Sequence, residues 1–342
     1  MSRVLVTGVG GRGIGLQILK SLRLSELKLW IVGSDVSQSA VKGTPIDSFT
    51  ELPRASSSDY LPALLRTIEA NQIKFVFPGS EPEIRTLTET STSQFEALDC
   101  TLVWQNPRVA TQLDDKFSAS LTMQQLKITS PKTVLAVDHD GVFGLQFPVL
   151  LKPRFGRASE GVEFARSRPE LEALLLILNH RGIQSEYICQ EYLPDNEGEF
   201  TAGVLHLPNG SFFGSSILRR DIRSTVGRRI SVEKTPNSPE ITISSGTSQG
   251  QFVEDSSIER VLQAAANALE SRGPLNFQFR LQKGIPLIFE INPRFSGSSY
   301  LRALAGHNEV ETLLRYHLGI PLPVWSSIDG RMAIREINEY VT

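Results

Sequence analysis

Short apolar runs alternate with segments of helical periodicity over roughly the first hundred residues. Residues 3–7 are rich in β-branched side chains, residues 16–24 repeat apolar side chains at helical spacing, and residues 29–32 form a second apolar run. This alternation predicts a parallel, doubly wound sheet, because parallel strands are joined by crossover helices. Asn106-Pro107 predicts the end of this first domain.

Beyond this boundary the pattern indicates antiparallel strand pairs. Residues 199–207 and 212–218 are strand-like runs separated by Asn209-Gly210, a dipeptide typical of tight hairpin turns. A further hairpin is expected to end at Asn292. Helices are expected at residues 171–178, 258–271 and 310–318. The second part of the chain is therefore predicted to be α+β.

Composition narrows the class of protein. The 342 residues are enough for two or three domains, and 40% hydrophobic with 21% charged residues is typical of soluble globular proteins. A net charge of −2 gives no indication of a nucleic-acid or membrane-surface partner. No apolar run approaches the length of a bilayer span, and Met1 leads directly into the first strand. We therefore expect a cytoplasmic enzyme or binding protein.

The cysteines of the chain, Cys100 and Cys189, each lie among apolar neighbours. Buried free thiols are expected rather than a disulfide, which agrees with a reducing compartment. Neither cysteine has a histidine nearby in the sequence, so neither is predicted to be a nucleophile.

A glycine cluster follows the first predicted strand. Gly8, Gly10 and Gly13 match the dinucleotide-binding fingerprint, and Asp35 ends the next strand, where ribose would bind. However, close packing of a strand on a helix requires glycine whether or not a cofactor binds. The Tyr-x-x-x-Lys pair of short-chain dehydrogenases is absent from the sequence. An NAD-dependent oxidoreductase is therefore kept as an alternative hypothesis.

The stretch from Glu290 to Arg294 carries the strongest chemical signal. Side chains two apart on a strand point to one face, so Glu290 and Asn292 are expected to lie together. Gln278, on the preceding strand, can approach them. Three hard oxygen donors with a single charge suit Mg²⁺ held jointly with polyphosphate oxygens, and Arg294 adds a fork-shaped phosphate donor. The alternative is a strand end capped by an Asn-Pro turn.

A second signal lies at the end of the apolar run of residues 149–151. Lys152 follows this run, and the loop from Gly156 to Gly161, which includes Ser159, comes after it. Backbone amides of a glycine-bounded loop can hold phosphates. No Gly-Lys-Ser/Thr follows, so the loop is not a P-loop. Lys152 is either a phosphate ligand or a surface charge at a strand end, and we favour the former.

The next strand ends in a segment suited to a nucleobase. Glu191, Tyr192 and Leu193 lie where a strand runs into a linker, which offers backbone donors and acceptors beside an apolar slot. Glu199, a few residues further, can accept hydrogen bonds from ribose hydroxyls. Taken singly, each glutamate would be an exposed surface charge; their order along the chain argues otherwise.

The ordered set resembles the ATP-grasp superfamily, in particular the carbamoyl-phosphate synthase large-chain branch. The residues that carry the resemblance are Lys116, Lys152, Glu191, Glu199, Gln278 within Asn-x-Gln-Phe, and Glu290, Asn292 and Arg294 within Glu-x-Asn-Pro-Arg. The resemblance covers nearly the whole chain. It implies an α/β protein with a Rossmann-like preATP-grasp domain at 1–106. A two-lobed α+β ATP-grasp domain at 107–320 would follow, with a mobile lobe at about 130–193, and then a C-terminal tail at 321–342.

The resemblance also implies roles for these residues. Lys116 and Lys152 would contact ATP phosphates, the loop with Ser159 and Gly161 would close over them, and Glu191, Tyr192 and Leu193 would hold adenine, with Glu199 on the ribose. Gln278, Glu290 and Asn292 would bind Mg²⁺ or Mn²⁺, and Arg294 would steady the transferred phosphoryl group. The implied activity is that of an ADP-forming carboxylate–amine ligase acting through an acyl phosphate.

One position departs from that branch. Carbamoyl-phosphate synthases carry an arginine three residues after the arginine of Asn-Pro-Arg, within the bicarbonate site, and this chain has Gly297 there. A larger acid, such as an amino acid, is therefore expected. Candidate substrate contacts are Glu81, Arg220, Arg223 and Arg302, although each arginine alone would be a solvated surface charge. The expected partners are a small carboxylate and an amine.

Two questions stay open at this stage. A nucleotide-binding sensor or scaffold without turnover is a second alternative to the ligase. The oligomeric state, a homodimer included, is not determined by the sequence.

Overall fold

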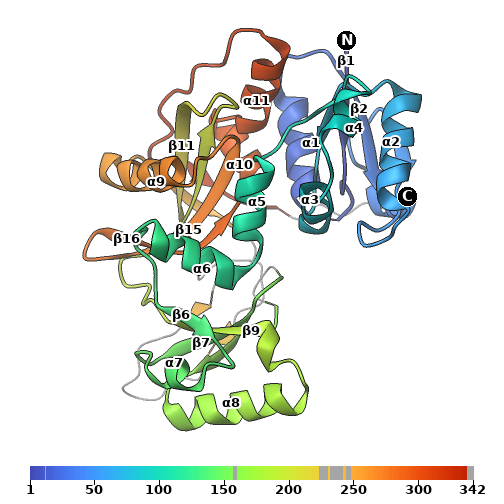
Figure 1. Cartoon of the computed structure of the whole chain (residues 1–342). Helices are drawn as coiled ribbons and strands as arrows, with labels where there is room; N and C mark the ends of the chain where they lie inside the picture. Colours follow the sequence, from blue (N-terminus) through green and yellow to red (C-terminus); the bar gives the residue numbers. More distant parts are fainter. Residues whose placement is uncertain (12, 157–159, 223–229, 232–241, 244–247, 337–342) are drawn as a thin grey trace.

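The computed structural model describes residues 1–11, 13–156, 160–222, 230–231, 242–243 and 248–336. The first domain contains a parallel sheet with the strand order β3-β2-β1-β4-β5. Its strands are β1 (Ser2–Val6), β2 (Leu29–Asp35), β3 (Ser48–Glu51), β4 (Phe75–Phe77) and β5 (Thr101–Leu102). Its helices are α1 (Ile14–Leu24), η1 (Gln38–Val41), α2 (Tyr60–Asn71), α3 (Glu81–Thr88) and α4 (Ser93–Glu96). The predicted doubly wound sheet is therefore confirmed (Figure 1).

Both faces of this parallel sheet are buried. Along β1, Val4 and Val6 belong to one hydrophobic core, whereas Leu5 belongs to the core on the opposite face. Successive strand residues point to opposite sides, and helices cover both faces of a parallel sheet, so an unbroken apolar strand is expected here. Cys100 lies in the second of these cores and Cys189 in that of the next lobe; both are free, as predicted.

A separate lobe follows, built on an antiparallel sheet with the order β6-β9-β7-β8. Its elements are β6 (Thr133–Leu135), α7 (His139–Phe143), β7 (Val149–Pro153), β8 (Glu163–Ala165), α8 (Arg168–His180), η2 (Gln184–Glu186) and β9 (Tyr187–Glu191). Leu171 and Leu175 of α8 pack on Val149 and Leu151 of β7. Figure 1 shows this lobe at the end of the molecule away from the first domain.

The third part is a large antiparallel sheet with the order β16-β15-β10-β11-β14-β17, called the large sheet below. Its strands are β10 (Glu199–His206), β11 (Phe212–Arg220), β14 (Gly250–Val253), β15 (Pro274–Gln282), β16 (Ile285–Asn292) and β17 (Met332–Ala333). Strands β12 (Ile230–Ser231) and β13 (Thr242–Ile243) pair with each other. The predicted Asn209-Gly210 hairpin joins β10 to β11, with Gly210 at φ +89°.

The helices of this part are α5 (Pro107–Asp114), α6 (Lys116–Gln125), α9 (Ser256–Ala268), α10 (Ser299–Ala305) and α11 (Glu309–Leu318). Phe200 and Ala202 of β10, with Phe277 of β15, share a core with residues of α5, α6 and α9. Because strand residues alternate, the opposite face of these strands carries polar side chains. This polar face consists of Glu199, Thr201, Asn276, Gln278, Arg280, Glu290 and Asn292.

The first domain and the large sheet are packed together. Val4 and Ile18 belong to the same core as Leu205 at the end of β10 and Leu313 of α11. Helix α1 packs on α10 and α11. Part of the predicted C-terminal tail is also incorporated, since β17 pairs with β14 and Trp325 stacks on His307 with 4.6 Å between ring centroids. No helix of the described residues is long and apolar enough to cross a membrane.

Candidate functional site

The predicted metal ligands lie on neighbouring strands of the polar face. Gln278 of β15 is opposite Glu290 of β16 in the strand register, and Asn292 follows Glu290 on the same side. The Asn292 Nδ2 atom donates to Glu290 Oε1 at 3.0 Å. All three side chains are half-buried. One carboxylate and two amide oxygens at one place fit a hard cation such as Mg²⁺ that is also bound by phosphate, and the role stays a prediction.

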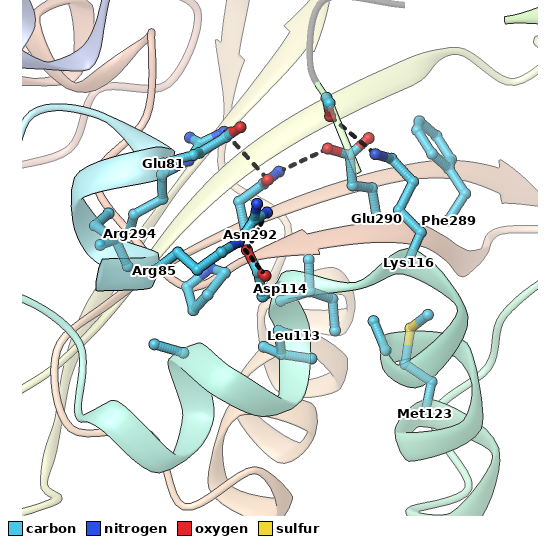
Figure 2. A pocket seen from close by; sticks show the side chains of 16 residues that line it. Glu81, Arg85, Leu113, Asp114, Lys116, Met123, Phe289, Glu290, Asn292 and Arg294 are labelled. Atoms are coloured by element: carbon cyan, nitrogen blue, oxygen red, sulfur yellow. Dashed lines mark hydrogen bonds and ion pairs between the residues drawn. The ribbon is translucent and has the colours of Figure 1, made fainter. Parts of the chain in front are cut away.

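An ion pair between Arg294 and a residue of the first domain lies beside these residues. Arg294 donates from Nε to Glu81 Oε1 at 3.0 Å, and its Nη2 donates to the same carboxylate. Glu81 is the first residue of α3 in the first domain. Arg294 Nη2 also lies 3.2 Å from Asn292 Oδ1, so the predicted phosphate donor and a predicted metal ligand are in contact (Figure 2).

The two predicted phosphate-binding lysines approach the predicted metal ligands from α6 and from the lobe. Lys116 begins α6 and donates from Nζ to the carbonyl of Gly156 at 2.9 Å, at the start of the glycine-bounded loop. Lys152 of β7 donates to Gln190 Oε1 at 2.6 Å, and its Nζ is 5.3 Å from the Phe289 ring centroid. Burial lowers the pKa of Lys152 to about 8, while Glu290 acts in the opposite direction. The site therefore lies between the lobe and the large sheet.

The loop that follows Lys152 is described only in part. Gly161 has φ +69°, and a Cβ there would lie 2.9 Å from Pro153 Cγ, so glycine is needed at this turn. Its start is anchored by Arg154, which pairs with Asp115, the N-cap of α6, at 2.7 Å. Ser159 and Arg223, both named from the sequence, lie outside the described residues.

The predicted adenine segment lies where β9 leaves the lobe. Glu191 Oε1 accepts from the backbone N–H of Gln146 at 2.9 Å, and Tyr192 meets the Phe164 ring edge-on with 5.6 Å between centroids. The carbonyl of Leu193 accepts a hydrogen bond from Arg280. These contacts hold the segment in place, and its role in binding adenine stays a prediction.

Glu199 is not an exposed carboxylate but the centre of a buried charge cluster. Only 1% of the residue is exposed. It accepts from Arg220 Nη1 at 2.6 Å and from Arg280 Nε and Nη2 at 3.0 and 2.8 Å. Sequence analysis did not single out Arg280, although it lies two positions after Gln278 and so on the same face. Glu199 thus binds two arginines, and its predicted contact with ribose stays untested.

Arg302, a candidate substrate contact, is also enclosed. It is 1% exposed, pairs with Glu309 at 3.3 Å and donates to Asn276 Oδ1 at 2.7 Å. A Cβ on Gly203 would lie 2.3 Å from Arg302 Nη1, so the glycine leaves room for the guanidinium. Arg220 and Arg302 are therefore buried ion-pair partners rather than solvated surface charges, because carboxylates compensate their burial.

A pocket opens at the end of β16, between α3, α5 and α6. Its polar lining includes Glu81, Arg85, Asp114, Lys116, Glu290, Asn292 and Arg294, and its apolar lining includes Ile84, Leu113, Met123 and Ile291. Figure 2 shows Glu81 and Arg294 on one side and Lys116 with Glu290 on the other. Of the predicted metal and phosphate residues, Lys116, Glu290, Asn292 and Arg294 line this opening, whereas Gln278 and Lys152 do not.

Several glycines near the end of β1 have packing roles. The carboxylate of Asp35 accepts from the backbone N–H of Gly10 at 2.8 Å, so one of its oxygens caps the loop. A Cβ on Gly10 would lie 2.7 Å from that oxygen. A Cβ on Gly15 or Gly79 would lie 2.3 or 1.8 Å from Thr7 O. These contacts require glycine at positions 10, 15 and 79 without a cofactor, which favours the packing interpretation there, whereas a Cβ on Gly13 would meet no atom within 4 Å.

Comparisons with known proteins agree with this architecture. Residues 4–103 match the PylC-like N-terminal domain, and residues 238–340 match the family described as ATP-grasp in the biosynthetic pathway with Ter operon. The first domain is thus similar to the PylC-like N-terminal domain and the C-terminal part to an ATP-grasp family, so the predicted resemblance to ATP-grasp proteins is confirmed. The narrower likeness to carbamoyl-phosphate synthases is supported only loosely. No curated protein sequence matches the chain.

Solved structures give the same fold. The N5-carboxyaminoimidazole ribonucleotide synthetase from Thermotoga maritima is 16% identical, with a TM-score of 0.64 over 96% of this chain and 79% of that chain. Biotin carboxylase from Campylobacter jejuni is 17% identical, with a TM-score of 0.66 over 96% and 73%. The L-amino acid ligase from Bacillus licheniformis is 16% identical, with a TM-score of 0.63 over 93% and 74%. The predicted preATP-grasp and ATP-grasp architecture is confirmed.

Proposed function

We propose that this chain is an ATP- and Mg²⁺-dependent, ADP-forming carboxylate–amine ligase. The observation that carries the proposal is the convergence of groups from both sides of one site. Glu290 and Gln278 lie on the large sheet, while Lys116 and Lys152 reach the same place from α6 and the lobe. Phosphoryl transfer needs this combination of cations and metal ligands, because the reaction is accelerated mainly by positioning and charge neutralisation.

Each of these residues has a role in the proposed reaction. Lys116 and Lys152 would bind phosphate oxygens, and Arg294 would stabilise the charge on the transferred group. Gln278, Glu290 and Asn292 would hold Mg²⁺ (or Mn²⁺), which would neutralise part of the phosphate charge when bound. No side chain is required to act as a general base in the first step, since a carboxylate is already ionised at neutral pH.

The proposed reaction has two steps. A carboxylate oxygen of the acid attacks the γ-phosphorus, and the bond from phosphorus to the β,γ-bridging oxygen breaks, so that ADP leaves. An amine nitrogen then attacks the acyl carbon. The bond from that carbon to the phosphate oxygen breaks, and the amine loses one proton as inorganic phosphate departs. The likeness to the L-amino acid ligase and the mixed lining of the pocket support a carboxylic acid larger than bicarbonate.

A screen of amino acids and other small acids for ADP release tests the proposal, with crude cell extract as the source of the amine. The expected result is ADP and phosphate in equal amounts with one acid or a small group of acids. Release of AMP and pyrophosphate would contradict it. Titration with NADH, followed by fluorescence, tests the oxidoreductase alternative, and absence of binding removes that alternative.

A further inference from the structure

Arg335 lies where three separate segments meet. It follows β17, and its guanidinium donates from Nε to the carbonyl of Ser248 at 3.3 Å and from Nη2 to the carbonyl of Gly297. Its Nη1 is 3.5 Å from Oε1 of Gln17 on α1 of the first domain. The C-terminal segment therefore places a positively charged side chain beside the loop that follows β16, the strand that carries the predicted metal ligands Glu290 and Asn292.

Among the described residues, this cation has no anionic partner. Seven other arginines of the described residues are buried or half-buried, and each pairs with a carboxylate: Arg23, Arg154, Arg220, Arg280, Arg294, Arg302 and Arg315. Arg335 is half-buried as well, but the partners it has within the described residues are neutral oxygens. A partly desolvated charge without a counter-ion is unfavourable, and an anionic ligand would compensate it.

Burial also lowers the pKa of Arg335, and no carboxylate of the described residues acts against this shift. The pKa of the buried Arg302 is lowered as well, but there Glu309 acts against the desolvation, and for Arg280 the charge of Glu199 makes the overall shift upward. Arg335 therefore differs from the other enclosed arginines in its electrostatic surroundings and not only in its hydrogen bonds.

The position of Arg335 relates to the one departure of this chain from the carbamoyl-phosphate synthase pattern. Gly297 stands where that branch has an arginine, and a Cβ on Gly297 would meet no atom within 4 Å. The surrounding loop is fixed, since Ser296 and Ser298 share a hydrogen bond of 2.7 Å and Ser299 donates to Glu309. A guanidinium from elsewhere in the chain thus contacts the backbone carbonyl of the position at which that branch has its arginine.

We propose that Arg335 binds the carboxylate of the acid that receives the phosphoryl group. The inference rests on the proposed ligase function for the fate of that carboxylate. A guanidinium presents parallel N–H groups that match the two oxygens of a carboxylate, and such a pair is strongest where water is partly excluded. The C-terminal segment that carries β17 is then a part of the substrate site.

Substitution of Arg335, with a matched control, tests the inference. For Arg335→Gln, we expect the KM for the acid to rise on the order of 30-fold or more, with Mg-ATP binding unchanged in calorimetry. Arg335→Lys should recover part of the loss, because the charge remains but the fork is lost. Arg331→Gln is the control: Arg331 is exposed on the same segment and donates to Ala305 O at 2.7 Å. It should leave the KM unchanged.

A labelling experiment gives a readout that does not depend on turnover. Phenylglyoxal should modify Arg335 in the free protein, and mass spectrometry would locate the modified residue. One or more of the probe acids bicarbonate, acetate, glycine and glutamate should protect Arg335 from this modification. Arg331 should be modified with or without the acid. An unchanged KM in Arg335→Gln, or labelling of Arg335 that no probe acid reduces, would overturn the inference. If the natural chain releases no ADP with any acid, the ligase proposal fails, and protection of Arg335 alone decides whether it is a carboxylate site.

Discussion

Arg294, directly after the predicted metal strand, is held by the carboxylate of Glu81 in the first domain, although 213 residues separate them in the sequence. The pair is partly shielded, with 13% of the Arg294 side chain and 25% of the Glu81 side chain exposed. The first domain therefore orients a group that we assign to phosphoryl transfer. This relationship connects the two matched domains at the site.

Glu81→Gln tests that relationship. The amide is neutral and holds Arg294 less firmly, so we expect kcat to fall about ten- to a hundredfold while the KM for the acid changes little. Steady-state kinetics with the acid found in the screen would measure both. Arg85→Gln is a suitable control, because it breaks the pair of α3 with Asp114 on the same pocket wall. A rise in KM with kcat unchanged would instead make Glu81 a substrate contact, as first expected from the sequence.

Glu290→Gln should remove most metal-dependent turnover and leave folding intact. Glutamine keeps the size of the side chain but removes the one charged ligand of the trio, so a loss of about a hundredfold or more in kcat/KM is expected. Stability should change little, since Glu290 is half-buried and Gln can still accept from Asn292. Activity over a range of Mg²⁺ concentrations and urea unfolding would be compared. Near-natural activity would show that the metal assignment is wrong.

Glu199→Gln should act mainly on stability. It removes the charge that neutralises Arg220 and Arg280 inside the protein, and breaking a buried pair in this way costs about 3–5 kcal/mol of unfolding free energy. Urea unfolding measures the change. Glu197→Gln, an exposed carboxylate two residues earlier, serves as the control. If Glu199→Gln instead weakens ATP binding without loss of stability, the ribose role predicted from the sequence is favoured.

The affinity for ATP should depend on pH through Lys152. Burial holds its pKa at about 8 in the free protein, and the ammonium form binds phosphate. Affinity should therefore be highest below pH 8 and should fall as the pH rises through 8, by up to about tenfold per pH unit. Calorimetric titration with Mg-ATP between about pH 7 and 9.5 would measure this.

Lys152→Arg is the matched variant for the pH experiment. Arginine stays protonated over the whole range, so the inflection near pH 8 should disappear even if the affinity itself is lower. A natural chain whose affinity is constant over the same range would show that Lys152 does not contribute its charge to phosphate binding.

Local patterns in the sequence were sufficient to predict a large part of the fold of this protein. The alternation of strands and helices specified the parallel first sheet, and Asn209-Gly210 specified a hairpin. The two-residue spacing of Glu290 and Asn292 placed them on one face, and Gln278 lies opposite Glu290, as expected. These features follow from short-range periodicity and turn chemistry, which operate over a few neighbouring residues.

Only the tertiary structure decided which charges meet. Arg220 and Arg280 reach Glu199 because β11 and β15 flank β10, and Arg294 reaches Glu81 because the first domain packs on the large sheet. No local pattern distinguishes these arginines from solvated ones, since their partners are chosen by strand order and domain packing. The same holds for Arg335, which only the fold brings beside Gly297. The sequence thus determined the strands and which polar side chains share a face, while long-range packing determined which charges are neutralised by a carboxylate.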